Sequence, residues 1–459
     1  MKRHIQKICL AIAIVMAFSL MLGACASSGQ TASSQQPSDS VQPATASAST
    51  QASAQASASD TSKSLAGQEI TVLLPPWYQE GLEATIPDFE KETGIKVNLQ
   101  ILDWEPLMDK IVTSCSAGTA PADVTEFSWD WTGTYYKAGW YEPLNDYFPS
   151  TMWDDILSKK AFSYEGKYMA VPIYNDFRLT YVDTADFTAA GIKDIPNTAD
   201  GMLEAARAIK KAGVSKYPIM LPLSATSATT TPWFMLTKAY GGELFDANWN
   251  PLFLAKDSAG YKAMSWVINA YKEGLVNPAA LDYKGTDVVD HFKNGDGSID
   301  IAGWAGNVTE YTKDDSKIAK TVKVIQVPGT ETASRTYGLQ EGVGIPSAST
   351  HKEAAVAFIK WINQEPFMEK FFTDYGIFPN HASTIKALTE ANKMPQGETV
   401  SKAMETIEPL FPQGAPSWYS SWETDVSTYM NQIAKGEMTM DKGLQAIADS
   451  AAKLKAAAK

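Results

Sequence analysis

Hydrophobic positions between residues 70 and 101 follow strand and helix periods in turn. The apolar run at 70–74 is typical of a buried strand, and alternate apolar residues at 95–101 indicate a second strand. Between the two, apolar residues at helical spacing predict a helix that stops at Gly94, and they are Leu82, Ile86 and Phe89. The folded part of the chain, which we expect to begin at Glu69, therefore opens as strand, helix, strand.

The same alternation continues beyond residue 101. Asp103 is a candidate cap for a helix that carries apolar residues up to Cys115 and stops at Gly118. A third short strand is predicted at 121–127. Strands that alternate with helices along a chain favour a doubly wound α/β sheet.

The pattern recurs after residue 180. An apolar helix stripe that includes Leu203 ends at Gly213, and a strand is predicted at 219–221. Further helices are predicted at 261–273 and 352–363. We therefore expect an α/β protein of two lobes, each a sheet flanked by helices.

The first 25 residues have the pattern of a bacterial secretion signal. Basic residues precede an uncharged apolar run at 9–22, and they are Lys2, Arg3 and Lys7. This run suits a signal peptide and is shorter than the roughly 20 residues of a membrane-spanning helix. It ends in Leu-Gly-Ala-Cys at 22–25, which resembles the lipobox of bacterial lipoproteins. We expect a signal peptide at 1–24 and a lipid (palmitate among its acyl chains) on Cys25 as the only membrane anchor. The alternative is an ordinary signal peptide, in which Cys25 is incidental.

Residues 25–68 have the composition of a disordered tether. They are mostly Ser, Ala, Thr and Gln, and from Ala26 onward their only larger aliphatic residues are Val41 and Leu65. So little apolar surface cannot offset the conformational entropy that folding removes. We expect this segment to hold the folded body off a membrane surface.

Net charge disfavours nucleic acid as a partner. The formal charge is 39 − 52 = −13, and without residues 1–24, which hold three basic and no acidic residues, it is 36 − 52 = −16. Contact with phosphates requires clustered Lys and Arg. A strongly anionic ligand is also disfavoured, unless a local basic pocket overrides the global charge.

Cysteine and histidine patterns argue against disulfides, zinc and other cofactors. Three cysteines cannot form a disulfide framework, and Cys115 is expected to be a small buried hydrophobe. The four histidines have no metal-ligand spacing. The segment 294–300 imitates part of a calcium-binding EF-hand loop, but Phe292 and Gly303 stand where carboxylates are required. Motifs of hydrolases, nucleotide-binding and dinucleotide-binding proteins do not occur in the sequence.

Short motifs occur in a fixed order along almost the whole mature chain. They are FEKETGIKV at 89–97, SAGTAPADV at 116–124, KAGW at 137–140, GKYMAVP at 166–172, FKNG at 292–295 with IAGW at 301–304, and GVGIP at 342–346. Together they resemble the extracellular solute-binding proteins of bacterial ABC importers, in particular the sugar-binding group that includes maltose-binding protein. Two departures from the family pattern are the insertion of Ala122 between Pro121 and Asp123, and Arg178, where apolar or small residues are more usual.

The resemblance implies two lobes joined by crossing segments, with the ligand held in a cleft that closes by a hinge motion. Transferred to this chain, the first lobe takes 69–176 and 340–385, and the second takes 177–335 and 386–459. The resemblance also implies the permease subunits of an ABC importer as partners. It further implies a monomeric binding protein without enzymatic activity at the outer face of the cell membrane.

Tryptophans point to a carbohydrate as the ligand. All 13 lie in the mature body, and only some, such as Trp266 and Trp361, have a simple explanation in helical apolar stripes. An aromatic ring stacks on the C–H face of a sugar, whose hydroxyl groups need fixed polar partners. Aromatic residues beside carboxylates and amides therefore suit a sugar pocket, although packing within a lobe explains any single ring equally well.

Candidate ligand-binding residues align with pocket positions of the family. They are Trp77, Tyr78, Trp129, Asp130, Trp131, Asn175, Asp176, Trp233, Trp304, Glu341, Trp418 and Tyr419. As alternatives, Asp130 and Asp176 are solvated loop acids, and Glu341 merely caps a turn. Arg178 is either an interlobe ion pair or a ligand contact.

The sequence therefore predicts a lipid-anchored substrate-binding protein of an ABC importer for an oligosaccharide. Three alternatives stay open. A cell-surface glycosidase would use two pocket carboxylates as acid and base. A binder of a cationic or zwitterionic solute, such as a polyamine, would also need aromatic rings and carboxylates. An adhesive surface lipoprotein would leave the crossing segments and the aromatic loops unexplained.

Overall fold

The computed structural model describes residues 65–331 and 334–458. The predicted signal peptide, Cys25 and nearly all of the predicted tether lie outside the described residues. Leu65, at the end of the predicted tether, is 4% exposed and packs into the core beside the first strand. Packing of the folded body thus includes a residue four positions before Glu69.

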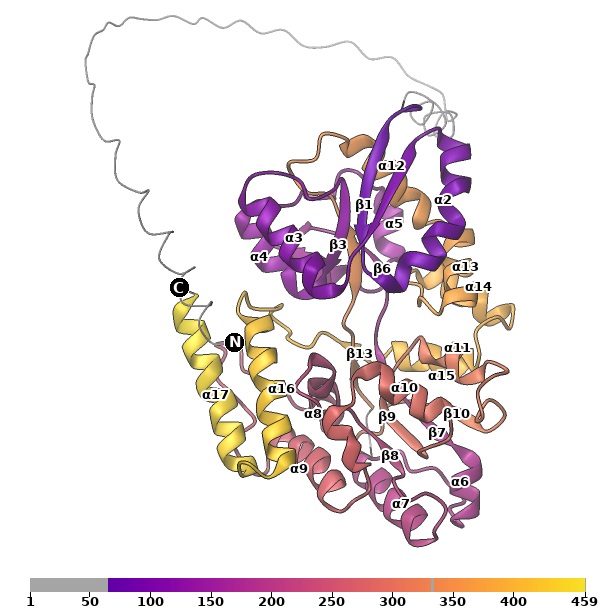
Figure 1. Ribbon diagram of the computed structural model, residues 1–459, viewed down its shortest axis with the longest axis vertical. Coiled ribbons are helices and arrows are strands. Elements are labelled where there is room, and N and C mark those ends of the chain that lie inside the picture. The colour runs from indigo at the N-terminus through magenta and orange to yellow at the C-terminus, as the bar shows by residue number, and fades with distance from the viewer. Residues whose placement is uncertain (1–64, 332–333, 459) are drawn as a thin grey trace, which may run out of the picture. The chain divides into compact units, whose positions relative to one another are not determined.

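The first sheet contains the three strands predicted near the start of the folded body (Figure 1). Its strands are β1 (Glu69–Leu74), β2 (Lys96–Ile101), β3 (Val124–Ser128), β6 (Val171–Tyr174) and β12 (Glu341–Gly344), in the order β2-β1-β3-β12-β6. Strand β1 is parallel to β2 and β3, whereas β12 is antiparallel to β3 and β6. The predicted α/β alternation is therefore confirmed, and a strand from late in the chain enters the middle of the sheet.

Helices α2 (Gln79–Thr93) and α3 (Trp104–Ser116) connect the parallel strands. Helix α2 ends at Gly94, whose φ of 74° is the left-handed conformation that glycine adopts without a steric penalty. Asp103 occupies the N-cap position of α3 as predicted, but its side chain accepts no hydrogen bond from the helix. Leu107, Ile111 and Cys115 of the predicted apolar stripe are buried, Met108 is partly buried, and Val112 is 42% exposed.

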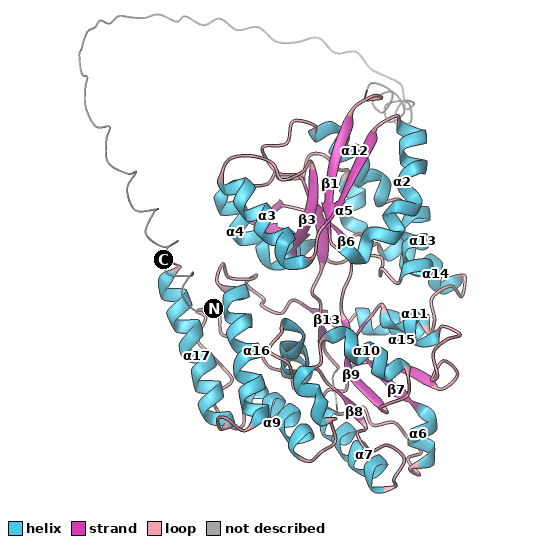
Figure 2. Ribbon diagram, viewed as in Figure 1, coloured by secondary structure: helices cyan, strands magenta, loops and turns pink. Residues whose placement is uncertain are grey.

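The second sheet has the order β10-β7-β9-β8. Its strands are β7 (Arg178–Asp183), β8 (Ile219–Met220), β9 (Ile299–Trp304) and β10 (Val322–Ile325). The helices between and after them include α6 (Thr184–Ala189), α7 (Ala199–Lys211), α8 (Thr230–Ala239), α9 (Ala259–Lys272), α10 (Gly285–Lys293), α11 (Asn307–Thr312), α16 (Tyr419–Lys435) and α17 (Met440–Ala457). Figure 2 shows both sheets flanked by helices, which is the predicted two-lobed α/β class.

The remaining elements are short strands and helices. They are α4 (Thr132–Ala138), α5 (Ser150–Asp155), β4 (Ser163–Tyr164), β5 (Lys167–Tyr168), β11 (Thr336–Tyr337), α12 (Lys352–Ile362), α13 (Glu365–Tyr375), α14 (Ala382–Glu390), α15 (Gly397–Met404) and β13 (Ile407–Glu408). None of the described helices is long and apolar enough to cross a membrane.

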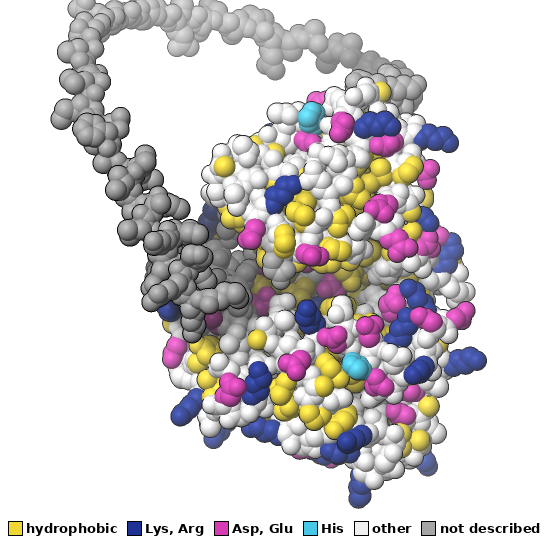
Figure 3. Space-filling model, in the orientation of Figure 1, with side chains coloured by type: hydrophobic (Ala, Val, Ile, Leu, Met, Phe, Trp, Pro, Cys, Tyr) yellow, Lys and Arg dark blue, Asp and Glu magenta, His cyan; other side chains and the backbone are white. Residues whose placement is uncertain are grey.

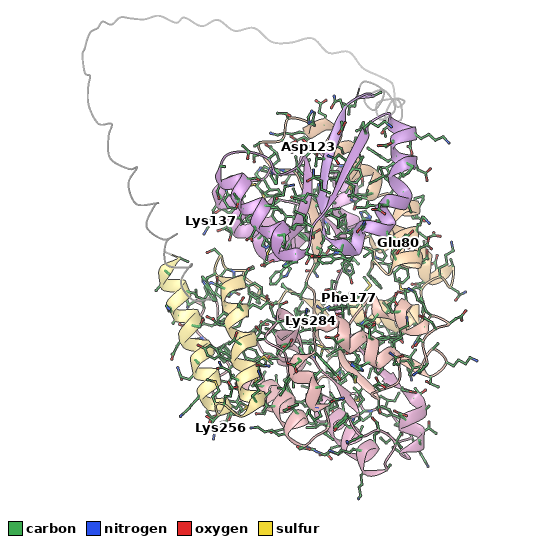
Figure 4. The ribbon with its side chains drawn as sticks, in the orientation of Figure 1. Glu80, Asp123, Lys137, Phe177, Lys256 and Lys284 are labelled. Carbon is green, nitrogen blue, oxygen red and sulfur yellow. The ribbon has the colours of Figure 1, made fainter. Side chains whose placement is uncertain are left out.

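Three segments connect the part built on the first sheet with the part built on the second. Phe177, labelled in Figure 4, lies between β6 and β7 and forms a bridge to Gly338, which lies between β11 and β12. The third segment lies between α13 and α14, and there the carbonyl of Phe378 accepts a hydrogen bond of 3.0 Å from the backbone N–H of Asn175. The crossing segments therefore lie side by side, although the lobe boundaries at residues 176, 340 and 385 stay a prediction.

Two tryptophans assigned to helical apolar stripes differ in burial. Trp266 is 2% exposed in α9, as expected. Trp361 packs against Phe89 but is only partly buried, and its ring N–H donates to Glu92 Oε2 at 3.1 Å. Trp361 therefore lies at the border of the core rather than inside it.

Candidate functional site

Aromatic residues gather at the edge of the first sheet where its parallel strands end. Trp77 and Tyr78 lie in a 3-10 helix directly after β1, and Trp129 and Trp131 lie in another directly after β3. The carboxyl ends of adjacent parallel strands meet at one edge of a sheet, which is where α/β proteins bind ligands. The order of the strands thus brings together residues that are about 50 positions apart in the sequence.

A row of three tryptophans runs along this edge, and its middle member was not among our candidates. Trp104, the first residue of α3, lies 5.7 Å from Trp77 and 5.3 Å from Trp131 between ring centroids. Trp77 is 42% exposed, whereas Trp131 is 5% exposed and packs inward on Tyr135. A signal for Trp104 was available, because α3 begins at the carboxyl end of β2 and therefore at the same edge.

Trp129 and Asp130 contact the second part of the molecule. The Trp129 ring lies 5.2 Å from Tyr419 at the start of α16, and 6.3 Å from Phe411. Asp130 Oδ2 accepts a hydrogen bond of 2.8 Å from Ser420 Oγ. The structure therefore brings together three candidates that sequence analysis named separately, namely Trp129, Asp130 and Tyr419.

The polar candidates of the crossing segment are buried. Asp176 Oδ1 accepts a hydrogen bond of 2.7 Å from Arg178 Nη1, and the two form an ion pair. Asn175 is 1% exposed, and neither its side-chain nitrogen nor its side-chain oxygen has a hydrogen-bond partner among the described residues. Burial raises the pKa of Asp176, although Arg178 opposes this effect. Arg178 thus neutralises an acid within the crossing segment, and its Nε also lacks a described partner.

Trp304 lies at the end of β9, opposite Arg178 in the pairing of β7 with β9. The Arg178 guanidinium lies 5.8 Å from the centroid of the partly exposed Trp304 ring. A cavity of about 30 Å³ adjoins the ring, and its polar lining includes Thr231, Asp300 and Asn307. Burial raises the pKa of Asp300 to about 6, although the Tyr311 hydroxyl donates a hydrogen bond of 2.8 Å to its carboxylate.

Glu341 is partly exposed and lies beside a buried acid that sequence analysis did not single out. In the β3–β12 register, Glu126 is opposite Val343 and Ser128 is opposite Glu341, so the two glutamates are diagonal neighbours on one face of the sheet. Glu126 is 0% exposed, and its carboxyl is within hydrogen-bonding reach of that of Glu341. Burial raises the pKa of Glu126 to about 8 and that of Glu341 well above its usual value. The signal for Glu126 was a single acid within a strand whose five residues are all buried.

Two candidate tryptophans do not join these groups. Trp233 lies inside α8, is 0% exposed, and donates its ring N–H to the carbonyl of Gly260 at 2.8 Å. Trp418 is 7% exposed and packs against Phe245 and Trp249, with ring centroids 5.8 and 5.4 Å away. Both rings are buried and pack against other aromatic residues.

Acidic side chains lie where the two parts face each other. Figure 3 shows the surface hollowed between them, with apolar and acidic side chains in the hollow. Glu423, in α16, belongs to the same region and was missed by sequence analysis. It accepts hydrogen bonds from the hydroxyl groups of Tyr419 at 2.8 Å and Thr230 at 3.2 Å. Its pKa is raised by burial to about 7.

Chemistry other than binding has little support in the described residues. Among them, no group of three His, Cys, Asp or Glu side chains is arranged to hold a metal ion. Burial raises the pKa of the Cys115 thiol to about 11, so this thiol is not activated as a nucleophile. The arrangement is instead a set of aromatic faces beside buried acids and amides, which can hydrogen-bond to a polar ligand and stack on its apolar faces.

Comparison with known proteins gives the same class. The sequence pattern of the family described as bacterial extracellular solute-binding protein matches residues 74–368. A diacetylchitobiose-binding protein of Streptomyces coelicolor is 24% identical over 404 residues, which are 83% of this chain and 88% of that protein. Two solved structures share the fold. A maltose-bound protein of T. maritima has a TM-score of 0.76 and 18% identity, over 84% of this chain and 100% of that one. A solute-binding protein of Agrobacterium radiobacter in complex with ribitol has a TM-score of 0.76 and 20% identity, over 85% and 99%.

Proposed function

Because the chain belongs to the family of bacterial extracellular solute-binding proteins, we propose that it captures a carbohydrate outside the cell and delivers it to an ABC permease. We propose an oligosaccharide as the ligand and the cleft between the two sheets as its site. The ligand is held by closure of the two lobes about the three crossing segments. The protein acts as a monomer that meets the permease subunits at the membrane.

The observation that carries this proposal is the pairing of aromatic faces with buried polar groups that lack partners. Asn175 offers an unpaired amide at 1% exposure, in the segment that joins the two sheets. Buried amides in folded proteins are almost always hydrogen-bonded, because an unpaired one costs roughly 1–3 kcal/mol. The hydroxyl groups of a sugar supply both donors and acceptors, and therefore satisfy both ends of this amide.

Aromatic residues on both sides of the junction support a sugar over a purely ionic ligand. Trp77 and Trp104 belong to the first part, whereas Trp304 belongs to the second. A sugar ring presents C–H faces that stack on such rings. The three proteins compared above are named for diacetylchitobiose, maltose or ribitol, and these three ligands are polyhydroxylated and uncharged.

The glycosidase alternative receives less support from the carboxyl groups. Glycosidases need two carboxyl groups about 5 Å apart or more, on opposite sides of the scissile bond. Glu126 and Glu341 instead lie beside each other as diagonal neighbours on one face of the sheet, and Asp176 is paired with Arg178. The family that the chain belongs to is one of binding proteins.

We also propose that the mature protein begins at Cys25 and is held by its lipid at the outer face of the cell membrane. The support is the lipobox-like sequence at 22–25 and the extracellular location of the family. The segment from Cys25 to about residue 64 then spans the distance between the membrane and the folded body. Lobe boundaries near residues 176, 340 and 385 belong to the same proposal.

A thermal-shift panel with the mature chain tests the proposed function. Solutes that bind only the folded protein raise its melting temperature as their concentration rises. We expect a rise with at least one of maltose, maltotriose, diacetylchitobiose and D-mannitol, and none with spermidine. A panel in which only spermidine raises the melting temperature would favour a binder of cationic solutes.

Asn175→Leu provides the matched variant for this panel. Replacement of an unpaired buried amide by an apolar side chain of similar size is expected to leave the ligand-free melting temperature unchanged or slightly higher. The shift caused by the sugar should be lost. If the variant has a lower ligand-free melting temperature and keeps the full shift caused by the sugar, Asn175 stabilises the fold and does not bind the ligand.

A further inference from the structure

The two glutamates of the first sheet form a buried pair of carboxyl groups that no cation of the described residues neutralises. Glu126 comes from the third position of β3, and Glu341 from the first position of β12. Neither carboxyl oxygen of Glu126 accepts a hydrogen bond from an N–H or O–H group of the described residues, and the same is true of Glu341 Oε2. Two adjacent carboxylates buried without a cation repel each other strongly, so such a pair retains a proton.

A third buried polar group lies close to the two glutamates. Tyr78 is 0% exposed, and the field of Glu126 and Glu341 adds to burial in raising the pKa of its hydroxyl. This hydroxyl has no hydrogen-bond partner among the described residues. Tyr78 comes from the segment after β1, so three separate segments direct buried, unpaired polar atoms to one place.

The other titratable groups around the two glutamates do not compensate the negative charge of this pair. They are Tyr174 on β6, Asp130 after β3, Asp176 in the crossing segment and Tyr141. The charge of Glu126 raises the pKa of the Tyr141 hydroxyl across the sheet. The nearest cation among the described residues that acts on this set is Arg178, which is paired with Asp176. Each neighbouring acid raises the pKa of Glu341 further.

We propose that Glu126, Glu341 and Tyr78 form a subsite in which a proton-sharing carboxyl pair hydrogen-bonds to adjacent hydroxyl groups of an uncharged sugar or polyol. The proposal rests on the proposed function and specifies in addition that the ligand is uncharged. A protonated carboxyl donates one hydrogen bond and accepts others, so the pair matches hydroxyl groups, which also do both. A cationic ligand would instead displace the shared proton and bind the ionised pair.

The proton itself is testable without a ligand. In the ligand-free mature protein near pH 7, infrared difference spectra between wild type and Glu126→Gln should contain the carbonyl band of a protonated carboxylic acid, present only in wild type. Because the folded-state pKa of Glu126 is raised to about 8, wild type should also lose stability relative to Glu126→Gln as the pH rises from about 5 to about 8. Identical spectra, or parallel stability curves, would overturn the shared proton.

The role in binding is tested by calorimetric titration of maltose, diacetylchitobiose and D-mannitol. We expect Glu126→Gln, which imitates the protonated acid, to retain affinity within about threefold at pH 7. Wild type should lose about tenfold in affinity between pH 7 and pH 9, as a group with a pKa near 8 ionises, and Glu126→Gln should not. Glu126→Leu, which keeps the volume but removes both oxygens, should lose at least tenfold while its melting temperature is not lowered.

Glu353→Gln is the matched control, since it removes the same charge from an exposed position on α12. It should behave as wild type in every titration. Binding of a sugar with equal affinity to wild type, Glu126→Gln and Glu126→Leu would overturn the subsite and leave the proposed function standing. Binding of spermidine that strengthens with pH and is abolished in Glu126→Gln would replace the uncharged ligand by a cation. Failure of all these solutes to bind wild type would instead count against the proposed function, while the infrared result still decides the proton.

Discussion

The hydroxyl of Ser420 donates a hydrogen bond of 2.8 Å to the carboxylate of Asp130, although the two residues are 290 positions apart. Asp130 follows a strand of the first sheet, whereas Ser420 lies in α16, which packs against α8 and α9 beside the second sheet. Tyr419 and Trp129 meet next to this bond. The contact therefore joins the two parts of the molecule at the edge of the proposed cleft, where it stabilises the arrangement in which they touch.

We predict that Asp130→Ala and Ser420→Ala each weaken ligand binding, because both remove the same contact across the junction. A hydrogen bond to a charged group contributes about 1.5–3 kcal/mol, so the affinity should fall by roughly 10- to 150-fold. The loss in the double variant should equal that of either single variant rather than their sum. Calorimetric titration of wild type, the two single variants and the double variant completes this double-mutant cycle. Additive losses in affinity would mean that the two residues act independently.

Trp304→Ala and Trp129→Ala should each lower ligand affinity about 5- to 150-fold. The range corresponds to about 1–3 kcal/mol, which is roughly the free energy of burying one large apolar side chain. The melting temperature of ligand-free Trp304→Ala should change little, because its ring is partly exposed. Wild-type affinity in both variants would show that these rings serve packing.

Trp233→Ala is the matched control for the tryptophan variants. This ring is 0% exposed and packs at tilted or edge-on angles against Phe234, Phe253 and Trp422. Its loss should lower the free energy of unfolding by about 3–5 kcal/mol, as for other large-to-small core substitutions. Urea unfolding and ligand titration of the same preparation should show the loss in stability with affinity retained in the folded fraction.

Hydrophobic periodicity was sufficient to predict the fold class and the early elements. Apolar stripes located α2 and α9, and Gly94 ended α2 as expected, because these signals are local. The position of β12 in the middle of the first sheet was not predictable from spacing, since it depends on pairing with β3 from more than 200 residues earlier. Long-range pairing of this kind leaves no periodic signal.

The candidate site was predicted in part. Trp129 and Asp130 follow the end of β3, Tyr419 begins α16, and the structure brings them together. Trp233 is not part of the site, because it lies inside α8, a helix that is buried on all sides. Glu126 was missed, since an acid in a strand is informative only when the burial of its neighbours is known.

Stability should depend on pH through Asp300, which is 2% exposed and has its pKa raised to about 6 by burial. The folded protein binds this proton more tightly than the unfolded chain, whose pKa is 3.8, so stability is lost as the pH rises through about 6. Asp300→Asn keeps an oxygen for the Tyr311 hydroxyl and removes the ionisation. Wild type should lose about 2.4 kcal/mol relative to this variant between pH 4 and pH 7, at about 1.4 kcal/mol per pKa unit. Urea unfolding at both pH values measures the difference, and an equal difference at the two would refute the prediction.

Cys25→Ala should abolish acylation. The protein should then leave the membrane fraction or persist as the unprocessed precursor, because the predicted cleavage depends on the modified cysteine. Metabolic labelling with a fatty acid, followed by fractionation, measures both outcomes. A correctly processed Cys25→Ala protein that stays with the membrane would contradict the lipid anchor.

The central claim, capture of a sugar without conversion, is tested most directly by equilibrium dialysis of the mature protein. The dialysed solute is labelled maltose or diacetylchitobiose, whichever raises the melting temperature more, and the bound solute is then released and separated by chromatography. We predict saturation at one molecule of solute per chain and recovery of that solute unchanged after prolonged incubation. Failure to saturate, or the progressive appearance of shorter sugars, would contradict the account.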